Sequence, residues 1–158
     1  MHLTTLHPSA KTHNHPTPQS VPCILCVDDD PEIPHTIALR LRDYNVSVQR
    51  AYHGMQGFWS AVTSKPDLII LDLAMPNGNG NHILETLKRN QQTAAIPVIV
   101  LTGMRDKKLP QKLFELGASQ YLHKPIHFDD LIHEIARFIR LERREGDAPS
   151  TEDVPGNA

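Results

Sequence analysis

One segment constrains the fold more than any other. Four consecutive apolar residues, Leu68 to Leu71, lead directly into Asp72, and a loop rich in Pro, Asn and Gly follows from Pro76 to Gly80. An uninterrupted apolar run is typical of a strand that is buried on both faces of a parallel sheet. A carboxylate at the end of such a strand lies at the edge of the sheet where α/β proteins bind ligands. A lone aspartate there can equally cap a helix or a turn, so the rest of the chain decides between these interpretations.

The residues around this segment alternate between strand and helix patterns. We expect an α/β fold, a doubly wound five-stranded parallel sheet with helices on both faces. The second strand alternates in polarity and the fifth is short, which places both at edges and favours the flavodoxin-like order 2-1-3-4-5. The expected strands are 23–27, 46–48, 67–71, 97–101 and 120–122, and the expected helices are 31–43, 53–63, about 80–90, a helix within 108–116, and 129–144.

The two ends of the chain lack this periodicity. Residues 1–20, rich in His and Pro, predict a disordered N-terminal arm, and residues 145–158 predict a disordered acidic tail, so the domain should occupy 21–144. A formal charge of −2 gives no indication of a general nucleic-acid or membrane surface. The sequence has no signal peptide and no apolar run near the roughly 20 residues of a membrane span, so we expect a cytoplasmic location.

Two cysteines, Cys23 and Cys26, form a CxxC motif inside the first expected strand. Residues three apart on a strand point to opposite faces of the sheet. A redox pair needs a helix N-terminus to lower a thiol pKa, and a zinc site needs a second pair of ligands. The sequence supplies neither, so buried structural cysteines are the favoured interpretation.

Reactive side chains stand where the strands end. Asp28 and Asp29 follow the first strand, and Asp72 ends the third. Thr102 follows the fourth strand and Lys124 the fifth. Three converging carboxylates repel one another by on the order of 4 kcal/mol per pair at 4 Å, and an all-oxygen site of this kind suits Mg²⁺. A lysine and a hydroxyl beside them suit a phosphoryl group, which Asp72 could accept as an acyl phosphate.

These residues and their spacing resemble the receiver domain of bacterial two-component response regulators. Asp30, which follows Asp28 and Asp29, is expected to cap the helix at 31–43 rather than to bind a ligand. The resemblance extends over about residues 22–143, and the intervals between its motifs agree with the family. The matching motifs are the acidic motif at 24–31, the phosphoacceptor segment at 66–76 with Gly80, the switch-threonine strand at 98–102, and the lysine motif at 117–125.

The resemblance implies a phosphoacceptor response regulator in a two-component or phosphorelay system. Asp72 would take a phosphoryl group from a histidine kinase or a histidine phosphotransfer protein. Asp29 and Asp72 would bind Mg²⁺ through their side chains and Ala74 through its carbonyl, whereas Asp28 would act largely through water. Lys124 would pair with the phosphoryl oxygens.

The resemblance also implies a switch. Thr102 would move toward the phosphoryl group and Tyr121 would turn inward, which reshapes the face of helix four, strand five and helix five for an unknown downstream protein. The Lys124–Pro125 peptide is cis in this family.

Two positions flank the site in the family and help to set how fast the acyl phosphate hydrolyses. They are Ala74 and Met104, and neither side chain can position an attacking water. We therefore expect slow to moderate self-dephosphorylation.

Two other functions compete with this interpretation. Phosphatases and phosphomutases with an aspartyl nucleophile carry a second aspartate two residues later, but Asp72 is followed by Leu73 and Ala74 and no substrate cap is encoded, so we expect no enzyme of this class. A receiver-fold interaction module that acts without phosphorylation is the alternative.

The residues after Arg144 are too few and too polar for an output domain, so we expect a stand-alone receiver without nucleic-acid binding in cis or membrane association.

Overall fold

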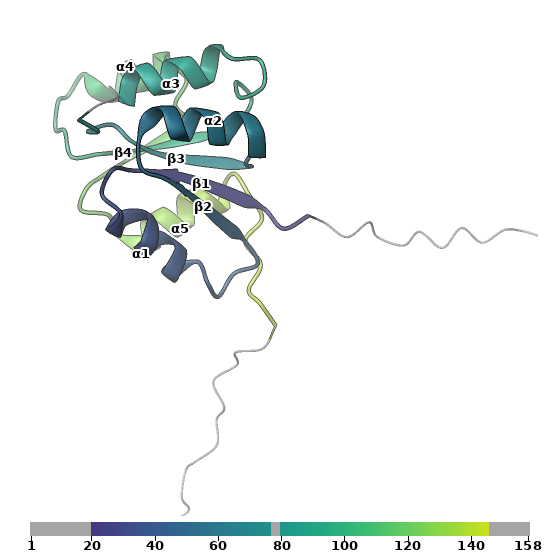
Figure 1. The fold of residues 1–158 in the computed structure, drawn as a ribbon. Coiled ribbons are helices and arrows are strands. Elements are labelled where there is room, and N and C mark those ends of the chain that lie inside the picture. Colours follow the sequence, from purple (N-terminus) through teal and green to yellow (C-terminus); the bar gives the residue numbers. More distant parts are fainter. Residues whose placement is uncertain (1–19, 77–79, 146–158) are drawn as a thin grey trace, which may run out of the picture.

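Five parallel strands form one sheet in the order β2-β1-β3-β4-β5, which confirms the predicted topology (Figure 1). The computed structural model describes residues 20–76 and 80–145. The strands are β1 (Cys23–Val27), β2 (Ser47–Ala51), β3 (Leu68–Asp72), β4 (Val98–Thr102) and β5 (Gln120–His123). The helices are α1 (Glu32–Arg40), α2 (Gly54–Ser64), α3 (Gly80–Arg89), α4 (Leu109–Glu115) and α5 (Phe128–Ala136).

The disordered arm predicted at 1–20 and the acidic tail predicted at 145–158 lie outside the described residues, apart from Ser20 and Glu145. Residues 77–79 of the predicted loop lie outside them as well. Over the ranges 20–76 and 80–145, none of the helices is both long and apolar enough to cross a bilayer.

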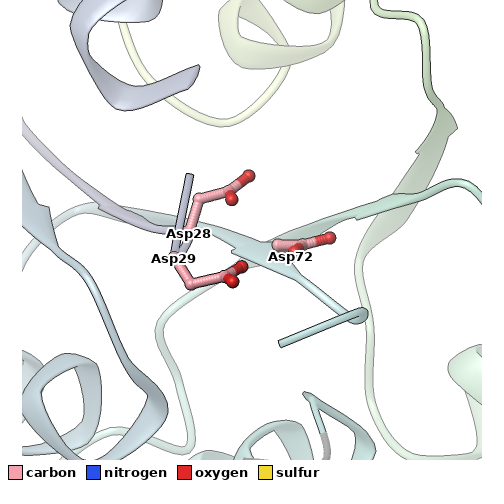
Figure 2. Close-up of side chains that lie close together, drawn as sticks. All are labelled: Asp28, Asp29 and Asp72. Carbon is pink, nitrogen blue, oxygen red and sulfur yellow. The ribbon is translucent and has the colours of Figure 1, made fainter. Parts of the chain in front are cut away.

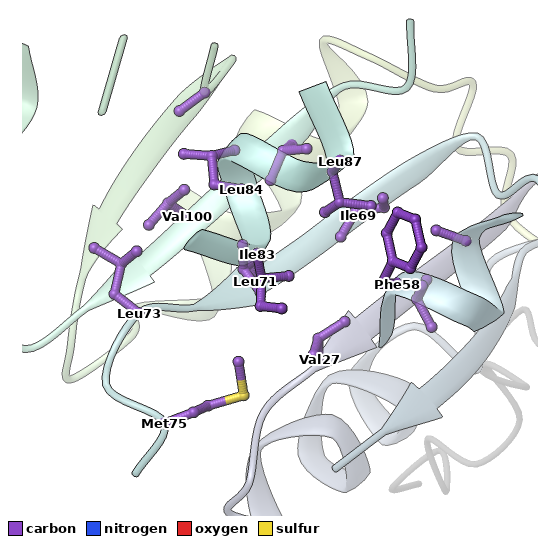
Figure 3. Packing of buried hydrophobic residues seen from close by; sticks show 14 of the residues in the cluster. Val27, Phe58, Ile69, Leu71, Leu73, Met75, Ile83, Leu84, Leu87 and Val100 are labelled. Carbon is purple, nitrogen blue, oxygen red and sulfur yellow. The ribbon is translucent and has the colours of Figure 1, made fainter. Parts of the chain in front are cut away.

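The apolar character of β1, β3 and β4 places them in the middle of the sheet. Their side chains alternate between two hydrophobic clusters, one on each face, because successive residues of a strand point in opposite directions. Helices α2, α3 and α4 cover one face, and α1 and α5 cover the other (Figure 1). On the first face, Phe58 of α2 and Leu87 of α3 lie beside Ile69 of β3 (Figure 3).

The two edge strands are more exposed, as their sequences predict. β2 runs from Ser47 to Ala51, further along the chain than the expected 46–48, and only Ala51 is fully buried. Cys23 and Cys26 are free thiols: Cys26 is buried in the cluster beneath α1 and α5, and burial raises its pKa. The predicted burial is confirmed for Cys26, whereas Cys23 is only half-buried.

The predicted end of the last helix was wrong. We expected 129–144, but α5 ends at Ala136, and the chain then turns so that Ile139 still closes the core. Beyond the turn, the carbonyl of Glu142 accepts a hydrogen bond from the amide of Asn45 (2.7 Å), and Tyr44 forms an antiparallel bridge with Arg143. Pairing with the loop between α1 and β2 therefore replaces the helical hydrogen bonds in this segment.

Residues near the start of α1 and of α4 explain where these two helices begin. α1 begins at Glu32 with Pro31 as its N-cap, one residue later than the expected cap Asp30. The carboxylate of Asp30 nevertheless accepts a hydrogen bond from the amide of Glu32 (3.0 Å). α4 lies within the expected 108–116, with Pro110 in its first turn, where its missing amide removes no helical hydrogen bond.

Gly80 is required where α3 starts, directly against the chain that leaves β3. A Cβ atom at Gly80 would lie 2.5 Å from Cα of Leu73 and 2.7 Å from the carbonyl oxygen of Asp72. Both contacts are with backbone, which cannot move aside as a flexible side chain can. Gly80 therefore allows α3 to pack against the residues that place Asp72.

We predict that Gly80→Ala lowers the free energy of unfolding by about 1–3 kcal/mol, as overpacking against fixed atoms does. Gly103→Ala is the matched control, because a Cβ atom at Gly103 meets nothing within 4 Å. Urea denaturation of both variants measures the difference. Equal stabilities would contradict the close approach at Gly80.

Candidate functional site

Three carboxylates converge at the carboxyl edge of the sheet. Asp28 follows β1 and Asp72 ends β3, and these strands are neighbours with Val27 paired to Leu71. The side chains of Asp28, Asp29 and Asp72 lie together there (Figure 2), with carboxylate oxygens within 4.8 Å of one another. Asp28 and Asp72 are buried, with 0% and 2% of their surface exposed, whereas Asp29 is exposed.

Asp28 is fixed by a set of short hydrogen bonds. Its amide donates to the carbonyl of Ala51 on β2 (3.0 Å), and its Oδ1 accepts from the amide of Asp30 (3.0 Å). Its Oδ2 accepts from Nζ of Lys124 (3.0 Å). Burial raises the pKa of Asp28, and the nearby charge of Asp72 adds to this, although the Asp30 amide and Lys124 oppose it. The ionised form of Asp28 is therefore held at a free-energy cost.

Lys124 spans two of the carboxylates. Its Nζ lies 3.0 Å from Oδ2 of Asp28 and 3.2 Å from Oδ1 of Asp72. The main chain positions it, since its amide donates to the carbonyl of Thr102 (2.8 Å) and its peptide bond to Pro125 is cis, as expected. Burial alone would lower the pKa of Lys124, but the hydrogen bond to Asp28 and the charges of both aspartates outweigh it and raise the pKa. Lys124 is thus a firmly held cation.

Thr102 ends β4, the strand next to β3, and its side chain is fully buried. Its Oγ1 accepts a hydrogen bond from the amide of Met104 (3.0 Å), which leaves the hydroxyl proton available to a group in the site. Met104 and Ala74, which the resemblance implies flank the site, are exposed in the loops after β4 and β3.

Tyr121 is half-buried on β5 and lies in a short series of aromatic rings. Its ring centroid is 5.8 Å from that of Phe114 on α4 and 5.5 Å from that of His123. The sequence analysis singled out Tyr121 but missed both neighbours. The alternation of a strand could have indicated His123, because residues two apart share a face. Phe114 lies on α4, so no local sequence pattern could have predicted its contact with Tyr121.

The donor set fits a hard divalent cation such as Mg²⁺. It consists of three carboxylates, and among the described residues the Lys124 ammonium forms ion pairs with two of them. Mg²⁺ prefers oxygen ligands from a few carboxylates. Oδ1 of Asp72 is buried and has no well-aligned hydrogen bond within the described residues, although the Lys124 ammonium lies near it. An acceptor in this state has a free lone pair for a metal or a phosphorus atom.

The buried charge of Asp28 leads to a prediction about stability. Because its pKa is raised, Asp28 penalises folding once pH rises through its folded pKa, and the penalty disappears below its unfolded pKa. Asp28→Asn keeps the shape and removes the charge, so without divalent cations it should stabilise the protein by about 0.5–2 kcal/mol at neutral pH. The gain should shrink as pH falls to about 4. Thermal unfolding at several pH values measures it.

The control is Asp43→Asn, because the Asp43 side chain is 58% exposed and its ion pair within the described residues is with Arg42 at the surface. It should leave the melting temperature unchanged. A loss of stability in Asp28→Asn at neutral pH, or a gain that does not depend on pH, would show that Asp28 is not strained by its charge.

Comparison with known proteins assigns the family. The family model of the response regulator receiver domain matches residues 24–136. The chain is 35% identical over 124 residues to the DNA-binding dual master transcriptional regulator RpaA of Synechocystis sp., covering 78% of this chain and 52% of RpaA. It is 32% identical over 122 residues to hybrid signal transduction histidine kinase D of Dictyostelium discoideum, covering 77% of this chain and 8% of the kinase. The chain therefore spans about half of the first relative and a small part of the second.

A solved structure agrees with this assignment. Chemotaxis protein CheY4 of Vibrio cholerae superimposes with a TM-score of 0.71 at 25% identity, covering 76% of this chain and all of CheY4. Sequence comparison and structural comparison therefore lead to the same result. The chain belongs to the response regulator receiver domain family.

Proposed function

We propose that this protein is the phosphoacceptor of a two-component or phosphorelay system and that Asp72 is the accepting residue. The buried Asp72 carboxylate carries the proposal: its Oδ1 has no well-aligned hydrogen bond within the described part of the chain and lies beside the Lys124 ammonium. A carboxylate held in this way is a nucleophile with its charge neutralised nearby. The phosphodonor would be a histidine kinase or a histidine phosphotransfer protein.

The proposed step is a displacement at phosphorus. An oxygen of Asp72 forms a bond to the phosphorus atom while the P–N bond of a phosphohistidine breaks, and the histidine leaves with the electron pair and takes up a proton. Lys124 exchanges its pairing with the Asp72 carboxylate for pairing with phosphoryl oxygens. The Thr102 hydroxyl donates to another phosphoryl oxygen while it still accepts from the Met104 amide.

We assign the metal site to Asp29, Asp72 and the carbonyl of Ala74, with Asp28 acting through water. Bound Mg²⁺ would neutralise the crowded carboxylates and the incoming phosphoryl oxygens. Support comes from the clustering of the three aspartates and from the raised pKa of Asp28, which burial and the charge of Asp72 produce. A cation at this position would relieve both effects.

The competing functions have less support. A phosphatase would need a general acid two residues after the nucleophile, but the side chain there, Ala74, is exposed and cannot carry a proton. An interaction module without phosphorylation would gain nothing from a buried carboxylate oxygen that, within the described residues, has no well-aligned hydrogen bond. We therefore retain the phosphoacceptor function, in a cytoplasmic protein whose output passes through α4, β5 and α5 to a downstream protein.

Intact-protein mass tests the proposal. After incubation with acetyl phosphate and Mg²⁺, the wild type should gain one phosphoryl group, and the gain should be absent with EDTA or in Asp72→Ala. Asp106→Ala is the matched control, because Asp106 is an exposed carboxylate in the loop after β4, and this variant should be phosphorylated normally. An unmodified, folded wild-type protein would overturn the proposal in favour of the unphosphorylated module.

The same samples give the lifetime of the acyl phosphate after the donor is removed. Ala74 and Met104 offer no hydrogen bond to an attacking water, so loss should take much longer than a few seconds. Ala74→Gln adds an amide that can hold such a water and should shorten the lifetime severalfold, whereas Met104→Leu should not change it. Complete loss of the wild-type phosphoryl group within seconds would refute this role of the two side chains.

A further inference from the structure

A hollow of about 370 Å³ lies between the end of α1 and the start of α5, which cover the same face of the sheet (Figure 1). Three of the residues that line it are arginines, Arg40, Arg42 and Arg143. Two carboxylates, Asp43 and Asp129, line it as well. We call this feature the α1–α5 hollow, and the phosphoacceptor site described above makes no use of it.

Two of the arginines are held against aromatic rings that also line the hollow. The guanidinium of Arg40 lies 5.0 Å from the centroid of the Phe128 ring. The guanidinium of Arg143 lies 5.8 Å from the centroid of the Tyr44 ring. Both arginines are exposed, and within the described residues neither forms an ion pair with a carboxylate. A guanidinium that contacts a ring can still offer N–H donors at its edge, so both cations are open to an acidic ligand.

The two carboxylates of the hollow do not cancel this charge. Asp43 is paired with Arg42, whose Nε lies 3.4 Å from its Oδ1. Asp129 lies in the first turn of α5, where the helix dipole stabilises a negative charge without an arginine partner. Arg144, next to Arg143, adds a further exposed cation. The chain as a whole has a net charge of −2, so this positive charge is local.

The last residues that the structure describes lie beside the hollow. The amide of Arg144 donates to the carbonyl of Asp43 (2.9 Å), and its Nε donates to the carbonyl of Tyr44 (3.0 Å). A second hollow, of about 650 Å³, is lined by both Arg143 and Glu145. Because Arg143 lines both hollows, the residues that follow Glu145 are attached at the rim of the α1–α5 hollow.

The segment attached there is acidic. Residues 146–158 contain Asp147, Glu152 and Asp153 and no basic residue. An extended chain spans up to about 3.5 Å per residue, so all three carboxylates can reach a hollow that begins where the segment is attached. A short covalent link also gives an effective concentration on the order of mM, which makes pairing favourable even where each contact is weak.

We propose that the α1–α5 hollow binds the acidic tail of the same chain, residues 147–153. The tail carboxylates would pair with Arg40 and Arg143, so that a segment too polar to fold alone is held by charge. The tail would then compete with acidic segments of other proteins for this surface. Nucleic acid fits less well, because Asp43 and Asp129 would repel a continuous phosphate backbone. The inference goes beyond the proposed function and needs neither Mg²⁺ nor a phosphoryl group.

NMR of the full, ¹⁵N-labelled chain tests the contact. The comparison is between the wild type and a tail-neutral variant with Asp147→Asn, Glu152→Gln and Asp153→Asn. The amides of Leu39, Tyr44 and Phe128 are far from the tail in sequence but line the hollow, so their shifts should differ between the two proteins. Raising NaCl from about 20 mM to about 0.5 M should move the wild-type shifts toward those of the variant, because salt screens the pairing.

A blocked peptide with the sequence of residues 146–158 tests the competition. It should bind the tail-neutral variant at least about threefold more tightly than the wild type, whose own tail occupies the hollow. Adding Arg40→Gln and Arg143→Gln to the tail-neutral variant should weaken peptide binding at least about fivefold. The matched control adds Arg89→Gln and Arg105→Gln, two exposed arginines on α3 and in the loop after β4, and should bind as the tail-neutral variant does.

Three results would overturn the inference. Unchanged amide shifts of Leu39, Tyr44 and Phe128 in the tail-neutral variant would show that the tail does not lie in the hollow. Equal affinity of the peptide for the wild type and the tail-neutral variant would assign the hollow to an acidic segment of another protein. Equal losses from the two arginine pairs, or tighter binding of a short DNA duplex than of the peptide, would show that the hollow does not recognise the tail.

Discussion

The structure depends on the ion pairs of Lys124 with Asp28 and Asp72. Two buried carboxylates and an exposed third meet at one edge of the sheet, and the Lys124 ammonium, within 3.0 and 3.2 Å of the buried pair, is the cation that allows this crowding. Burial, and to a lesser extent the charge of Asp72, raises the pKa of Asp28, so its ionised form is held at a free-energy cost. The proposed binding site for a cation and a phosphoryl group would use this crowding of carboxylates.

The fold brings the residues of the site together at the carboxyl edge of the sheet. Parallel pairing of β1, β3, β4 and β5 brings the residues after each strand to the same side, so that groups far apart in the sequence become neighbours. Gly80 lets α3 begin against the backbone of Asp72 and Leu73, and the amide of Lys124 is held by the carbonyl of Thr102. In the account proposed above, the loops that leave these strands would carry a change at the site to the surface of α4 and β5.

The sequence predicted the sheet order and the residues of the carboxylate cluster, because unbroken apolar strands and charged strand ends are local signals. The end of α5 could not be predicted in this way. Phe138 and Ile139 continue a helical pattern of apolar residues, yet pairing of the following segment with Tyr44 and Asn45 ends the helix, and this contact is invisible in the local sequence. The contacts of Phe114 and His123 with Tyr121 likewise depend on tertiary packing.

The central claim is that Asp72, among three clustered aspartates, accepts the phosphoryl group. Borohydride reduction of the phosphorylated protein, followed by peptide sequencing in a mass spectrometer, tests this directly, because it converts an aspartyl phosphate to homoserine at the modified position. We predict homoserine at position 72 alone. Homoserine at position 28 or 29, or at none of the three, would contradict the account.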